Sequence, residues 1–131
     1  MTLPLRFRRT WLIIGWILVL IAIYGSLTGN DFLAGSGVND KFMHAGTYAT
    51  LSLWFAGIYP RSRYLVIAVG LFALGFSMEL LQGWMRHGRM RDMHDVFANT
   101  LGIAIGLAVA TWWLGGWAQR LERLLARRAE T

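Results

Sequence analysis

Four long apolar segments constrain this chain more than any other feature of its sequence. They are residues 11–27, 42–59, 64–84 and 96–117, and each has 17 to 22 residues. A helix needs roughly 20 residues to cross the hydrocarbon layer of a membrane. Every backbone amide must be satisfied inside that layer, so such segments have to be helical. The pattern predicts an all-α, polytopic membrane protein built as a bundle of four transmembrane helices.

Composition supports the same interpretation. Apolar residues make up 56% of the chain and charged residues 15%, whereas a soluble domain carries about 25% charged residues. Five tryptophans near segment ends fit an aromatic belt at the membrane–water boundary: Trp11, Trp84, Trp112, Trp113 and Trp117. The chain has no cysteine, which excludes disulfides, thiolate metal sites and cysteine nucleophiles. We expect one domain over residues 1–131, with a basic tail at 118–131.

The placement of basic residues predicts the orientation of the bundle. If the N-terminus is cytoplasmic, nine arginines lie inside, and the four basic residues Lys41, Arg86, Arg89 and Arg91 lie outside. The positive-inside rule therefore predicts that both termini are cytoplasmic. The first segment has the basic flank of a signal peptide, but its apolar run is long and no A-x-A site follows, so we expect a retained helix. The tail alternates leucine with arginine. It is either an amphipathic helix on the anionic inner leaflet or a solvated helix.

Polar residues of three segments are expected at the same membrane depth. They are spaced three or four apart, so each group shares one helix face: Asp40, His44 and Tyr48; Glu79 and Gln82; Asp92, Asp95 and Asn99. The last face continues through Gly102 and Gly106, a small-xxx-small pattern that allows close helix packing. We expect this face to pack inside the bundle, against the second or third segment. The two glycines also offer a contact for a homodimer.

These polar residues carry a resemblance to a known family. The stretches DKFMHAGTY, ELLQ and GRMRDMHDVFANTLGIAIG resemble, in that order, the pattern of the VanZ-like family of small bacterial membrane proteins. The positions that match are Asp40, Lys41, His44, Tyr48, Glu79, Gln82, Gly88, Arg89, Asp92, Asp95, Asn99 and Gly102. The resemblance implies a multi-pass protein of the bacterial inner (cytoplasmic) membrane. It also implies a cell-envelope role and, through the member that names the family, a link to resistance to the glycopeptide teicoplanin.

The first functional hypothesis is a binding site for an anionic headgroup. Arg89, with Lys41, Arg86 or Arg91, would hold the phosphate or carboxylate of an anionic lipid or an envelope precursor such as a polyprenyl phosphate, because a guanidinium bonds two oxygens at once. Carboxylates would orient these basic groups, and amides and His44 would add neutral hydrogen bonds. Tyr48 is as well suited to packing as to ligand contact. We expect membrane lipid as the partner and no nucleic acid.

Two alternatives remain open. One is a membrane-embedded hydrolase or phosphoryl-transfer enzyme, in which His44 is a general base and Arg89 neutralises a phosphoryl charge. A divalent ion on His44, Glu79, Asp92 and Asp95 would be a variant of this chemistry. However, no recognisable metal spacing is present, so we expect no metal and no other cofactor. The other alternative is a polar staple that fixes helix register, or a scaffold for a partner protein.

Overall fold

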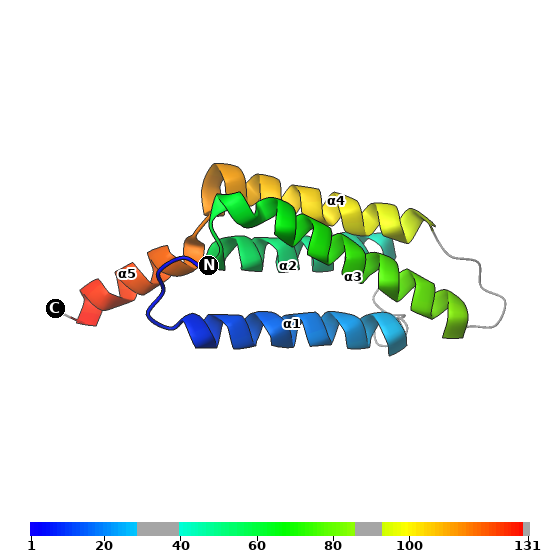
Figure 1. Ribbon diagram of the computed structural model, residues 1–131, viewed down its shortest axis with the longest axis horizontal. Coiled ribbons are helices and arrows are strands. Elements are labelled where there is room, and N and C mark those ends of the chain that lie inside the picture. Colours follow the sequence, from blue (N-terminus) through cyan, green and yellow to red (C-terminus); the bar gives the residue numbers. More distant parts are fainter. Residues whose placement is uncertain (29–39, 86–92, 130–131) are drawn as a thin grey trace.

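The computed structural model describes residues 1–28, 40–85 and 93–129 of the chain, and all secondary structure in these residues is helical. This confirms the all-α class. A short 3-10 turn, Arg61–Arg63, precedes α3, and a π-helical turn, Ala110–Leu114, continues α4. The α-helices are α1 (Arg8–Thr28), α2 (Asp40–Ile58), α3 (Tyr64–Met85), α4 (Met93–Val109) and α5 (Trp117–Ala129). Helices α1 to α4 run side by side along the long axis, and α5 extends beyond one end of the bundle (Figure 1).

The fourth predicted segment, 96–117, is wrong at its C-terminal end. The backbone N–H of Gly115 donates to the carbonyl of Ala110 at 2.7 Å and closes the π-helical turn. Gly116 then adopts a φ of 68°, a conformation that glycine enters without the steric cost that a Cβ imposes. The helix therefore ends before Trp117, and Trp117 belongs to α5. The amphipathic tail is thus a separate helix set at an angle to α4.

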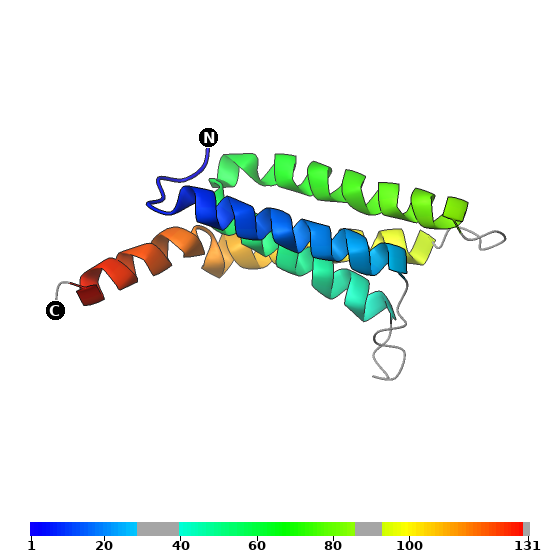
Figure 2. The same ribbon diagram turned by 90° about the horizontal axis from the view of Figure 1, so that it is seen from below.

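Helix α2 lies at the centre of the bundle and contacts α1, α3, α4 and α5. Figures 1 and 2, viewed at right angles, show α2 running alongside α1 and α4. The apolar core is formed by buried side chains from all four helices: Val19, Tyr48, Leu51, Phe55, Leu71 and Ile103. The central position explains why α2 is the least apolar of the four. Its surroundings are mostly protein, so it tolerates polar residues that a lipid-facing helix would not.

Helices α2 and α4 approach so closely that side chains at two positions are excluded. A Cβ on Gly102 would collide with the carbonyl oxygen of Ala45. A Cβ on Gly106 would collide with the carbonyl oxygen of Ala49 and the hydroxyl of Ser52. This confirms the predicted packing of the glycine face against the second segment. Both glycines are buried within one chain, so a homodimer through them, which stays a prediction, would require α4 to leave α2.

Three helical segments of the described residues are long and apolar enough to cross a membrane: Arg8–Thr28, Arg61–Met85 and Met93–Ala129. Their outer faces carry large exposed apolar side chains, among them Ile17 and Leu20 of α1, Leu65 and Val69 of α3, and Phe97 of α4. A continuous apolar surface of this extent is unfavourable in water and marks contact with lipid. The helices therefore indicate a membrane protein with several spans.

The end of the bundle that carries α5 is held by tryptophans. The rings of Trp11, Trp54 and Trp117 pack on one another with centroids 4.9 to 5.9 Å apart. Trp54 donates its indole N–H to the carbonyl of Trp11, and Trp117 donates to Leu53. Trp11 and Trp117 therefore have a packing role at this end, and their place in an aromatic belt stays a prediction. The other three expected belt residues are exposed by 71 to 79%: Trp84, Trp112 and Trp113.

The carboxylate of Glu122 also holds helices together at the end of the bundle that carries α5. Glu122 of α5 accepts hydrogen bonds from the backbone N–H groups of Arg6 and Phe7, at 2.7 and 2.9 Å. It accepts a third from the indole of Trp11 at 2.8 Å. The first N–H groups of a helix and of the chain leading into it have no partner within the helix. Glu122 supplies such partners and ties α5 to the start of α1.

Candidate functional site: a buried polar cluster at the end of α2, α3 and α4

The sequence-predicted polar residues gather at the end of the bundle opposite α5. We call the polar cluster the six residues of this group that α2, α3 and α4 bring together: Asp40, His44, Tyr48, Glu79, Asp95 and Asn99. Glu79, Asp95 and Asn99 are exposed by 3 to 6%. These three are polar side chains that the packing has taken away from both lipid and water. Desolvation of such groups is costly, so their placement has to be compensated by specific contacts.

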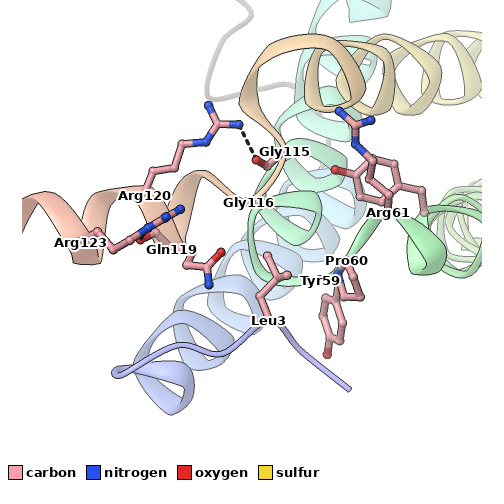
Figure 3. A pocket seen from close by; sticks show the side chains of 10 residues that line it. Leu3, Tyr59, Pro60, Arg61, Gly115, Gly116, Gln119, Arg120 and Arg123 are labelled. Carbon is pink, nitrogen blue, oxygen red and sulfur yellow. Dashed lines mark hydrogen bonds between the residues drawn. The ribbon is translucent and has the colours of Figure 1, made fainter.

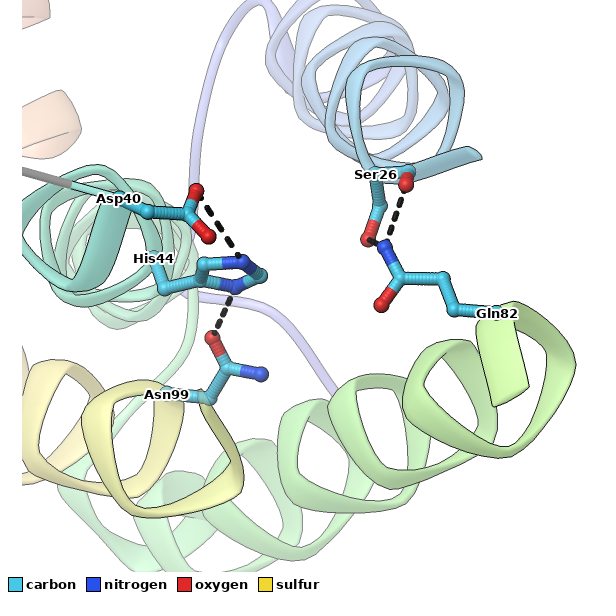
Figure 4. A network of polar contacts seen from close by, with 5 residues as sticks. All are labelled: Ser26, Asp40, His44, Gln82 and Asn99. Atoms are coloured by element: carbon cyan, nitrogen blue, oxygen red, sulfur yellow. Dashed lines mark hydrogen bonds and ion pairs between the residues drawn. The ribbon is translucent and has the colours of Figure 1, made fainter. Parts of the chain in front are cut away.

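His44 is the centre of the contacts within the cluster. Its Nδ1 atom lies 3.0 Å from Oδ1 of Asn99, and this hydrogen bond joins α2 to α4. Its Nε2 atom faces Oδ1 of Asp40 at 3.8 Å, one turn earlier on α2. Figure 4 shows the imidazole ring held between these two side chains. The spacing of four residues between Asp40 and His44 places both on one helix face, as the sequence predicted.

Asp95 completes a compact group of possible metal ligands. One carboxylate oxygen from Asp40, one from Asp95 and one ring nitrogen of His44 all lie within 4.8 Å of one another. Asp95 is in the first turn of α4, where its negative charge is also favourable beside the positive end of the helix. The sequence placed Asp40 and Asp95 on different helices and gave no reason to expect this distance between them.

The deeper side of the cluster depends on a close approach of α3. A Cβ on Gly75 would lie 3.1 Å from the amide nitrogen of Asn99 and 3.2 Å from the hydroxyl of Tyr48. The bare backbone at Gly75 therefore makes room for both side chains. Tyr48 also belongs to the apolar core, so its ring has a packing role while its hydroxyl reaches the polar region. Sequence reasoning missed Gly75, although its position one turn before Glu79 was a usable signal.

Glu79 is one turn beyond Gly75 on the same face of α3. Its side chain is buried. Gln82, the other predicted residue of α3, lies elsewhere. Its amide nitrogen donates to the backbone carbonyl and to the hydroxyl of Ser26 on α1, as Figure 4 shows. The amide of Gln82 thus links α3 to the end of α1, a partner that the sequence did not indicate.

Lys41, another predicted residue, is exposed beside Asp40 at the start of α2. Arg89 and Asp92 lie outside the residues that the structure describes. Within the described residues, the cluster thus combines three carboxylates, an imidazole, an amide and a phenol. These groups are able to bind a cation, to exchange protons or to hydrogen-bond a polar ligand.

A second polar feature lies at the opposite end of the bundle. A pocket of about 340 Å³ is lined by Tyr59, Arg61, Tyr64, Arg120 and Arg123, among others (Figure 3). Arg120 donates to the carbonyls of Trp113 and Gly115, both at 2.8 Å, and Arg61 donates to the carbonyl of Thr111. These arginines bond carbonyls that the helix end leaves unpaired. They support the break between α4 and α5, and none belongs to the polar cluster.

The family is shown by comparison with known proteins. The family model described as VanZ/LLP1 matches residues 3–114 of the chain, a range that includes α1 to α4 and all of the polar cluster. Searches of the curated proteins and of the solved structures found no match. The match covers most of the sequence and agrees with the motifs at Asp40 to Tyr48 and Asp95 to Gly102. The chain belongs to the VanZ/LLP1 family.

Proposed function

We propose that this protein binds the anionic headgroup of a membrane lipid or of a cell-envelope precursor at the polar cluster. The observation that carries the proposal is a group of four ionisable side chains from α2, α3 and α4 at one end of the bundle: Asp40, His44, Glu79 and Asp95. Glu79 and Asp95 are buried, and His44 and Asp40 adjoin them with partial exposure. A buried ionisable side chain inside a membrane costs about 2.5 to 3.5 kcal/mol on insertion scales and marks a functional site by default. Two buried carboxylates with two more ionisable groups beside them are more than fixing helix register requires.

The cluster is open on one side, which a purely structural contact would not need. The Asp40 side chain is 38% exposed and that of His44 is 13% exposed. The ring of His44 therefore lies between the buried amide of Asn99 and the rim of the bundle. Lys41 at this rim, with Arg89 of the following loop motif, would bond the oxygens of a phosphate or carboxylate. A ligand that enters from the rim would meet Lys41 first and His44 next.

We further propose that all of α1 to α4 cross the bacterial inner membrane and that both termini are cytoplasmic. Helix α2 has 19 residues, about 28 Å at 1.5 Å per residue, close to the roughly 30 Å of the hydrocarbon core. Contacts of Leu3 with Ile58 and of Arg6 with Glu122 hold both ends of the chain at one end of the bundle. The arginine-lined pocket lies at this end, which fits the positive-inside rule. The polar cluster would then face the external side.

The ligand class follows from this location. An external, membrane-level site with basic groups at its rim suits a polyprenyl phosphate or an anionic phospholipid better than a soluble metabolite, because the lipid tail has apolar helix surface beside it. The exposed apolar faces of α3 and α4 supply that surface. A role in handling an envelope precursor would also agree with the link of the VanZ-like family to teicoplanin resistance.

Native mass spectrometry of gently purified protein tests the headgroup proposal. We expect the wild type to carry one selected anionic lipid or polyprenyl phosphate, and Arg89→Ala to lose it while remaining folded. Arg63→Ala is the matched control, because Arg63 is an exposed arginine at the opposite end of the bundle. If all three proteins carry the same unselected lipids, the proposal is wrong. The cluster would then act as a polar staple or as a scaffold for a partner protein.

A further inference from the structure

The polar cluster presents an electrostatic problem for an anionic ligand. Its described residues contribute three carboxylates, from Asp40, Glu79 and Asp95. In the low dielectric of a membrane protein, repulsion between carboxylates and an approaching phosphate is much stronger than in water. Positive charge therefore has to lie between the carboxylates and the phosphate. Lys41 is exposed beside Asp40 at the start of α2.

The geometry of His44 identifies where such a charge belongs. The Nδ1 atom of His44 is held by the side-chain amide of Asn99 at 3.0 Å. The Nε2 atom faces a carboxylate oxygen of Asp40 at 3.8 Å. A cation placed between Nε2 and this oxygen would have a ligand on each side. A hydrogen bond from a side chain that holds the other ring nitrogen of a histidine is also the arrangement that orients metal-binding imidazoles.

The carboxylate of Asp95 is a third group at this place. It makes a metal ion the better candidate for this charge than a second proton on His44. A proton is shared by two atoms, whereas here an oxygen of Asp95 lies within 4.8 Å of both other ligand atoms. Three ligand atoms around one ion with bonds of about 2.1 Å lie roughly 3.0 to 3.6 Å from one another. The three atoms here lie within 4.8 Å of one another, so the side chains would draw closer together when they bind the ion.

We propose that Asp40, His44 and Asp95 bind a divalent transition-metal ion such as Zn²⁺ or Mn²⁺. One nitrogen and two oxygen ligands suit these ions, whereas Mg²⁺ and Ca²⁺ prefer oxygen ligands alone. Three protein ligands leave at least one coordination position open. If the protein also binds an anionic headgroup, as the proposed function has it, an oxygen of that headgroup takes the open position. The ion then bridges the phosphate to the carboxylates.

Titration of the full chain with Zn²⁺ or Mn²⁺ alone tests the metal site. The protein is purified in non-ionic detergent, treated with chelator and freed of lipid. We expect one ion per chain, with affinity reduced at least tenfold by Asp40→Asn and by His44→Gln. His94→Gln is the matched control, since His94 is an exposed histidine of α4 next to Asp95, and it should bind as the wild type does. Asp40 is partly exposed at a helix start, so its variant should fold normally.

Two outcomes of this titration would overturn the metal site. One is that the wild type binds no more tightly than Asp40→Asn. The other is that His94→Gln, and not His44→Gln, removes the binding. In either case the positive charge of the site comes from the side chains of the protein itself.

A second measurement separates the metal site from the headgroup site. Native mass spectrometry is repeated on wild type and Asp40→Asn, each with and without chelator. Lipid retained by the wild type, and lost both with chelator and in Asp40→Asn, supports the metal bridge. Lipid retained under all conditions overturns the bridge but leaves headgroup binding intact. Metal bound without any selected lipid overturns headgroup binding and leaves the metal site intact.

Discussion

The amide oxygen of Asn99 lies 3.0 Å from the Nδ1 atom of His44, and these two residues join α2 and α4 at the polar cluster. Asn99 is 3% exposed, so no solvent is available to replace it as a partner. The same two helices are pressed together one and two turns deeper, at Gly102 and Gly106. The hydrogen bond and the glycine contacts thus belong to one interface, and each allows a separate prediction.

Replacement of Asn99 should destabilise the fold moderately. Asn99→Ala removes the acceptor for His44 and leaves a buried ring nitrogen unpaired, which costs about 1 to 3 kcal/mol. We expect a lower midpoint of thermal unfolding in detergent, followed by circular dichroism. Thr100→Ala is the control, because Thr100 is the exposed neighbour and bonds only the carbonyl of Val96 on its own helix. Equal midpoints for the two variants would contradict the role assigned to Asn99.

A methyl group added at the glycine face of α4 should destabilise the fold more than Asn99→Ala does. Gly102→Ala would force a Cβ into the carbonyl of Ala45. Backbone atoms yield less than side chains, so we expect a loss near the upper end of the usual 1 to 3 kcal/mol of overpacking, or roughly 3 kcal/mol. Gly70→Ala on α3 is the control, because nothing lies within 4 Å of its added Cβ. Unfolding midpoints report both changes, and a tolerated Gly102→Ala would mean that α2 and α4 are farther apart.

Glu122 should slow the hydrogen exchange of two backbone amides that are far from it in the sequence. Glu122→Ala removes the acceptor for the N–H groups of Arg6 and Phe7. The contact is close to solvent, so its loss is on the order of 1 kcal/mol, which corresponds to hydrogen exchange about five- to tenfold faster at these amides. Arg127→Gln on the exposed face of α5 should leave exchange at both amides unchanged. Equal exchange in the wild type and Glu122→Ala would show that α5 does not hold the start of α1.

The proposed orientation predicts opposite accessibility for two engineered cysteines. The chain has no cysteine of its own, so Lys41→Cys and Arg128→Cys each carry a single thiol. In intact cells, a membrane-impermeant maleimide should label Lys41→Cys, while Arg128→Cys should react only after permeabilisation. Labelling of both from outside would contradict the four-span topology, and the reverse pattern would mean that the orientation is inverted.

The sequence predicted most helix positions because hydrophobic length alone determines them in a membrane protein. The family motifs and the spacing of His44, Asn99, Gly102 and Gly106 also indicated which face of each helix turns inward. Other features depended on tertiary geometry. The end of α4 depended on the backbone at Gly116, and Trp117 is apolar enough to be counted in the wrong helix. The sequence assigned no interhelical partner to Gln82. The spacing of residues along one helix does not tell how far the neighbouring helix is shifted along the bundle axis.

The proximity of Asp40 and Asp95 could not be predicted for the same reason. Each carboxylate was assigned to a helix face, but the distance between two faces is set by the residues that separate the helices. Here that distance is short because Gly102 and Gly106 let α4 rest on the backbone of α2. The sequence showed the two glycines of α4. Their effect on the distance between the carboxylates of the polar cluster required the three-dimensional structure.

The hydrogen bonds of Glu122 to Arg6 and Phe7 have a consequence for biosynthesis. They join positions 115 and 116 residues apart, so the ribosome must finish α1 to α4 before the partner of the α1 start exists. Before α5 is made, the start of α1 is held by its contacts with α2, such as the hydrogen bond from Trp54 to the carbonyl of Trp11, and Glu122 adds its contacts when α5 folds back. A translation product that stops before residue 122 would place its helices in the membrane without closing this contact, and that end of the bundle would be the first to fray.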